Sequence, residues 1–207
     1  MKGLFKPDSG LMIVMTQITD CIFLSMFFLM GCVPVVTTGA SFAALYDAAY
    51  RGFRQGEKNS WQRFLQVFKT NWKAGILPTI LFYGVLIGAG YGMIQLWNGV
   101  VAGKVGWMLF AGAAFAAVVL VGMLSLLFPI LSRFENSLAG LVVNTVVLSL
   151  AHLPRTVVLG IVNTLAALLC VLYVLPAFVL PALAALIGSL LIEPIFKPYM
   201  RQEEAAE

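Results

Sequence analysis

The chain has 207 residues, of which 61% are hydrophobic and only 11% are charged, against roughly 25% charged in an ordinary soluble domain. The mean hydropathy of +0.96 describes the whole chain, and a soluble fold of this length could not bury so much apolar surface. In lipid every backbone polar group must be satisfied internally, which leaves helices or closed barrels. The apolar stretches are long and do not alternate, so we predict one all-α domain over 1–207, a polytopic transmembrane helical bundle.

Six stretches approach the roughly 20 residues that cross a bilayer core. The predicted spans are 11–33, 36–54, 75–97, 105–131, 156–175 and 178–196. The second span is the least certain, because it contains Asp47 and ends in Arg51 and Arg54. Without it the chain would have five spans.

The positions of the basic residues bear on the topology. If 36–54 crosses the membrane, twelve of the thirteen Lys and Arg residues share one face, and only Lys104 lies opposite. The positive-inside rule then places both termini in the cytoplasm. If 36–54 does not cross, Lys2 and Lys6 move to the outer face.

Two further segments, 60–73 and 135–152, are predicted to be amphipathic helices at the cytoplasmic interface. Over 60–73, Ser60 is a candidate N-cap, and bulky apolar residues recur at helical spacing opposite a polar, cationic side. Such a helix either docks a cytoplasmic partner or anchors the chain in the headgroup layer. The candidate docking residues are Trp61, Arg63, Phe64, Phe68, Trp72, Arg133 and Glu135.

The first predicted span contains an ionisable residue near its middle, Asp20, with Gln17 one turn before it. Burying such a residue in lipid costs free energy. An ionisable group at that depth indicates a functional site unless it is paired. Pro34 breaks the chain after this span, and Thr37 or Thr38 can cap the next helix or bind freed backbone groups. These four residues, Asp20, Gln17, Thr37 and Thr38, form the candidate intramembrane site. Asp47, by contrast, has a local explanation in an i,i+4 pair with Arg51.

Gly84, Gly88 and Gly92 stand four residues apart in the third predicted span. Small residues at this spacing let helix backbones approach closely. They predict either packing within the bundle or self-association into a homo-oligomer.

The residues that carry chemistry are few. His152 is the single histidine, and Cys21, Cys32 and Cys170 fall in three different spans with no metal-ligand spacing. The net charge of +4 is spread over loops, unlike a nucleic-acid-binding patch. We therefore expect no enzyme activity, no metal, no cofactor and no nucleic-acid partner.

Four short motifs in order, GLFKPDSGLM, CVPVVTTGAS followed by ALY, FPILSRFENSL and FKPY, resemble the YesL family of bacterial integral membrane proteins, a domain of unknown function. The resemblance runs nearly end to end and implies a multi-pass protein of the bacterial cell membrane. Genes of that family tend to lie beside sugar ABC importers, which implies an accessory or assembly subunit that contacts the permease. The family supplies no catalytic residues.

The sequence thus leaves two functions open. The first is the accessory subunit of a carbohydrate ABC importer, bound to the permease through its spans or through 60–73. The second is a small transporter or channel with a broken-helix site at Asp20, Thr37 and Thr38.

Overall fold

The computed structural model describes residues 10–56, 59–133, 138–173 and 175–204, and its regular structure there is entirely helical. Three short helical pieces connect the longer elements: η1 (Val35–Thr37), the π-helical η2 (Tyr50–Arg54) and η3 (Leu175–Phe178). The α-helices are α1 (Gly10–Cys32), α2 (Thr38–Ala49), α3 (Ser60–Asn71), α4 (Ile76–Val101), α5 (Trp107–Arg133), α6 (Leu138–Ala151), α7 (Leu153–Leu172) and α8 (Leu180–Glu204).

Four of these helices are long and apolar enough to cross a membrane. The four stretches are Met15–Cys32, Ile76–Val101, Trp107–Ser132 and Leu153–Leu172. They coincide within a few residues with four of the predicted spans, which confirms a helical membrane protein. The last predicted span corresponds to a shorter apolar stretch, Leu180–Phe196, within α8. The two amphipathic segments are also helices, namely α3 and α6.

The predicted second span, 36–54, has a different structure. It consists of η1, the 12-residue α2 and the π-helical turn η2. A helix of 12 residues is about 18 Å long, well short of the roughly 30 Å of hydrocarbon in a bilayer. Eleven of its twelve residues are buried by the rest of the protein. The small residues of TGASFAALYDAA therefore pack inside the molecule, and the structure does not show a span here.

The start of α2 and the start of α4 lie side by side. The backbone N–H of Gly39 donates to Thr79 Oγ1 at 3.0 Å, and the same hydroxyl donates to the Gly75 carbonyl at 2.6 Å. A Cβ on Gly75 would contact the backbone of Ala40. Between these contacts, α2 and α3 form a hairpin that leaves this point and returns to it. Residues 40 and 75 therefore lie next to each other, although 34 residues separate them in the sequence.

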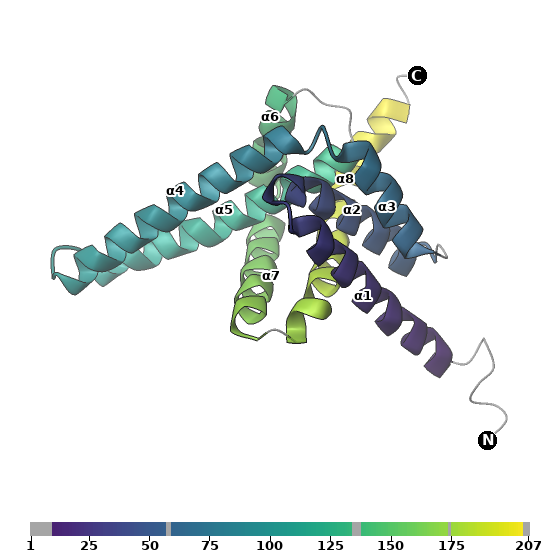
Figure 1. Ribbon diagram of the computed structural model, residues 1–207. Coiled ribbons are helices and arrows are strands. Elements are labelled where there is room, and N and C mark those ends of the chain that lie inside the picture. Colours follow the sequence, from purple (N-terminus) through teal and green to yellow (C-terminus); the bar gives the residue numbers. More distant parts are fainter. Residues whose placement is uncertain (1–9, 57–58, 134–137, 174, 205–207) are drawn as a thin grey trace.

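The remaining long helices diverge from the buried α2 (Figure 1). α4 and α5 form a long hairpin that projects from the rest, and α7 and α8 form a second hairpin. α5 and α7 touch through backbone, because a Cβ on Gly122 would overlap the Thr156 carbonyl oxygen and a Cβ on Gly160 would overlap that of Val118. This close contact brings polar residues of the two helices together inside the membrane-spanning region.

Candidate functional site

The structure does not bring the predicted intramembrane site together. Asp20 and Gln17 lie in the N-terminal half of α1, which continues unbroken to Cys32. At 1.5 Å per residue, Asp20 is about 18 Å along the helix axis from that end. Gln17 is exposed and Asp20 is half-buried. Because α1 stays straight through this stretch, the carboxylate cannot share a site with Thr37 and Thr38.

The two threonines serve the break in the chain. Thr37 Oγ1 lies 2.7 Å from the carbonyl oxygen of Gly31 and 2.8 Å from that of Pro34, and it donates to this pair of acceptors. Thr38 Oγ1 donates to the Val35 carbonyl at 2.9 Å. Neither makes a side-chain cap bond to α2, whose N-cap position is occupied by Thr37. Binding of freed carbonyls by these hydroxyls agrees with the prediction, while helix capping by them does not.

The predicted docking face of α3 is divided between the interior and the surface. Phe64 is buried and Phe68 half-buried, and the two rings stack with centroids 6.1 Å apart beside Phe27 of α1. Trp61 and Trp72 at the two ends of the face are each 44% exposed. The periodicity of α3 therefore reflects packing on α1 and α2, and the two tryptophans of this face remain exposed. Ser60 begins α3 after Asn59 and does not cap it.

Arg63 ties α3 to α2. Its Nε donates to Asp47 Oδ2 at 2.6 Å, while Arg51 Nε lies 3.3 Å from the same carboxylate. The Asp47 side chain is 2% exposed, so burial would be costly without these partners. The predicted pair with Arg51 exists, but the shorter bond comes from the next helix. Of the other docking candidates, Arg133 ends α5 with its side chain outside the described part of the structure, and Glu135 lies outside the described residues.

The glycines at four-residue spacing do not pack within the described chain. A Cβ added at Gly84, Gly88 or Gly92 would meet nothing within 4 Å. Packing inside the bundle, one of the two predicted uses of these glycines, is therefore not what they provide here. The backbone contact belongs instead to Gly122 and Gly160.

A cavity of about 450 Å³ lies among α1, α2, α4, α5, α7 and α8. It sits at the depth of the membrane-spanning stretches, between Phe28 of α1, Leu86 of α4 and Cys170 of α7. Phe42, which lines it, is 36% exposed. Among the described residues that line it, none is Asp, Glu, Lys, Arg or His. A cavity of this size and character suits an uncharged, largely apolar molecule.

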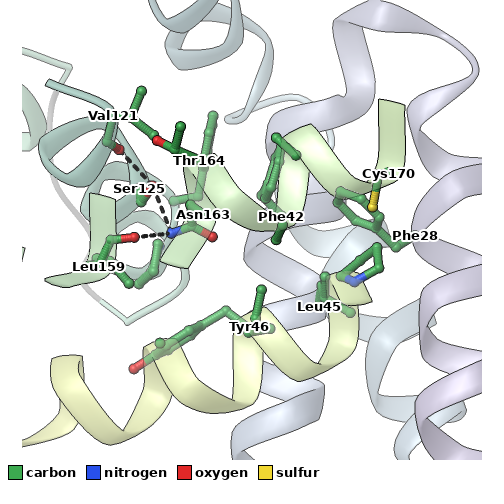
Figure 2. Close-up of a pocket in the computed structure, with 18 of the residues that line it drawn as sticks. Phe28, Phe42, Leu45, Tyr46, Val121, Ser125, Leu159, Asn163, Thr164 and Cys170 are labelled. Carbon is green, nitrogen blue, oxygen red and sulfur yellow. Dashed lines mark hydrogen bonds between the residues drawn. The ribbon is translucent and has the colours of Figure 1, made fainter. Parts of the chain in front are cut away.

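One wall of the cavity is polar. Asn163 Nδ2 donates to the Leu159 carbonyl at 3.0 Å and to Ser125 Oγ at 3.1 Å, and Ser125 Oγ donates to the Val121 carbonyl at 2.7 Å. Because a carbonyl can only accept, these bonds fix the amide orientation of Asn163. Figure 2 shows its amide oxygen turned the other way, toward Phe42 and Tyr46. The wall therefore presents a hydrogen-bond acceptor to the cavity.

Thr164, beside Asn163 on α7, also lines the cavity. Its Oγ1 is buried and has no hydrogen-bond partner within the described part of the chain. Threonine in a membrane helix usually donates to the carbonyl four residues earlier, and a buried hydroxyl left unpaired is rare in native proteins.

Sequence analysis did not select Ser125, Asn163 and Thr164. The available signal was Asn163, an amide near the middle of an apolar span.

Among the described residues, no three His, Cys, Asp or Glu side chains gather as metal ligands would. Tyr46, which also lines the cavity, donates its hydroxyl to Glu193 Oε1 at 3.2 Å. In Figure 2 that hydroxyl points away from the Asn163 amide oxygen.

Residues 11–91 match the family described as "Protein of unknown function, DUF624". No curated protein and no solved structure matches the chain. The matched stretch includes α1, the α2–α3 hairpin with its Asp47 ion pairs, and most of α4. The name YesL stays a prediction. The chain is thus a helical membrane protein whose residues 11–91 match the DUF624 family, which is described as of unknown function.

Proposed function

We propose that the protein is a non-enzymatic accessory or assembly subunit of a membrane complex, and that it binds its partner through the α4–α5 hairpin. The observation that carries the proposal is the open glycine face of α4, where a Cβ on Gly84, Gly88 or Gly92 would meet nothing within 4 Å in the described chain. The exposed side chains of Ile80 and Ile87 flank it. A transmembrane helix of another protein could approach closely there.

The partner class comes from the resemblance to YesL proteins, whose gene context implies the permease of a carbohydrate ABC importer. We place the contact on α4 because the inner face of α3 is already used by α1 and α2. The alternative of a stand-alone transporter lacks support, since α1 holds Asp20 apart from Thr37 and Thr38.

Replacing Gly88 with leucine is expected to abolish co-purification of permease subunits from mild detergent, because a bulky side chain keeps helix backbones apart. The matched control is Gly90→Leu. Gly90 is also open, but at 100° per residue it faces nearly the opposite side of α4. We expect Gly90→Leu to retain the wild-type stoichiometry. Loss of the partner in both variants, or in neither, would contradict a specific contact at this face.

We also propose a five-span topology with the N-terminus on the outer face and the C-terminus in the cytoplasm. The supporting observation is the return of the α2–α3 hairpin to its origin, which puts the end of α1 and the start of α4 on one side. In Figure 1 the start of α1 lies at the bottom of the view and the end of α8 at the top. Ten of the thirteen Lys and Arg residues then face the cytoplasm, all except Lys2, Lys6 and Lys104.

Cysteine labelling distinguishes this topology from one with six spans. In a background lacking the native cysteines, a membrane-impermeant maleimide applied to intact cells should label Lys104→Cys but not Val33→Cys. Val33 is 80% exposed, so protection would come from the membrane and not from burial. Both positions should react after lysis. Labelling of Val33→Cys in intact cells would favour six spans and both termini inside.

A further inference from the structure

We propose that the cavity between α5, α7 and α2 binds a neutral, single-chain lipid that carries a hydroxyl group, of the monoacylglycerol type. This inference concerns a ligand site separate from the α4 face, so it can fail without affecting the proposed subunit role.

The apolar lining determines the body of the ligand. The cavity of about 450 Å³ is walled mainly by Phe, Leu, Ala and Pro side chains, and pockets of roughly 300–1,000 Å³ hold small molecules of this size. Phe28, Leu86 and Cys170 place it at the depth of the spans. At that depth the surrounding solvent is hydrocarbon, so an acyl chain is the expected occupant.

The polar wall determines the head of the ligand. Asn163 Nδ2 is occupied by Leu159 and Ser125, so only its amide oxygen remains to face the cavity, as Figure 2 shows. This oxygen requires a donor from the ligand. Thr164 Oγ1, buried and without a described partner, can both donate and accept. A monoacylglycerol has two hydroxyls that can pair with these groups, because each hydroxyl donates one hydrogen bond and accepts others.

The absence of charge excludes other lipids. None of the described lining residues carries a charge that could pair with a phosphate or a carboxylate. Burying an ionised group without a partner is strongly unfavourable. A phospholipid headgroup or a fatty-acid anion should therefore be rejected, and a methyl ester of the same chain length should lose the donated hydrogen bond.

The test uses the full chain in phosphatidylcholine nanodiscs and a monoacylglycerol with a photoreactive group in its chain. We expect cross-links to residues that line the cavity. Unlabelled monoacylglycerol should compete for them, and the methyl ester or the fatty acid should compete at least about threefold less well. Thr164→Val, nearly isosteric, should weaken binding by about three- to tenfold, the usual net effect of one hydrogen bond. Thr164 has no described bond to lose, so this variant should fold normally.

Thr19→Val is the matched control, since Thr19 is an exposed threonine in the α1 span, outside the cavity. We expect Thr19→Val to bind the monoacylglycerol with the affinity of the wild type. Equal competition by the ester or the fatty acid, unchanged binding to Thr164→Val, or cross-links confined to residues that do not line the cavity would each overturn the proposal.

Discussion

Arg63→Ala is expected to lower the free energy of unfolding by about 3 kcal/mol, the scale found when one partner is removed from a buried ion pair. The Asp47 carboxylate would remain inside the protein without its shortest described ion pair, with Arg51 still 3.3 Å away. Arg51→Ala should cost less, because the 2.6 Å bond from Arg63 survives. Denaturant unfolding of the detergent-solubilised protein, followed by tryptophan fluorescence, measures both changes.

A double variant separates electrostatics from packing. Asp47→Leu with Arg63→Met removes both charges and fills a similar volume, and such replacements are often neutral or stabilising. We expect it to recover most of the stability lost in Arg63→Ala. If Arg63→Ala unfolds at the wild-type denaturant concentration, the ion pair does not hold α3 to α2. If the double variant is as unstable as the single one, the loss does not arise from the charge left on Asp47.

Gly160→Ala is expected to destabilise the protein by about 3 kcal/mol, at the upper end of the cost of overpacking. The added Cβ would overlap the carbonyl oxygen of Val118, and backbone cannot move aside as a flexible side chain can. Gly122→Ala should act alike, since its Cβ would overlap the carbonyl oxygen of Thr156. The same denaturant experiment, with circular dichroism as a second signal, gives the magnitude.

Gly88→Ala is the matched control for this pair, because its Cβ would meet nothing within 4 Å. Alanine favours a helix over glycine by about 1 kcal/mol, so this variant should be no less stable than the wild type. Equal destabilisation of Gly88→Ala and Gly160→Ala would show that the loss is not due to α5–α7 contact.

The α5–α7 contact also positions the polar wall of the cavity. Ser125 lies three residues after Gly122, and Asn163 lies three residues after Gly160, so each polar residue is about one helical turn from a contact glycine. The hydrogen bond of 3.1 Å between Asn163 and Ser125 depends on the helices staying this close. A glycine substitution that separates them should therefore disturb the cavity as well as the fold.

The segment 36–54 shows that composition cannot distinguish a membrane span from a helix buried inside the protein. Small residues such as Gly39, Ala40 and Ala43 are apolar enough to suggest a span, and the same residues suit a helix enclosed by others. Hydropathy measures only the preference to leave water, which lipid and protein interior both satisfy. The length of the regular helix, 12 residues, became apparent only with the structure.

The sequence alone determined that lipid surrounds this protein, because 61% of its residues are hydrophobic and lie in long runs. In lipid, such runs pair their backbone polar groups by forming helices. Periodicity also located the apolar face of α3, and spacing found the local pair of Asp47 with Arg51. Tertiary structure decided which surfaces meet. It joined Arg63 to a carboxylate sixteen residues earlier, paired Gly122 with Gly160, and gathered Ser125, Asn163 and Thr164 around one cavity. Side chains on different helices become neighbours only when the helices pack, and residue spacing along the sequence does not show which helices pack together.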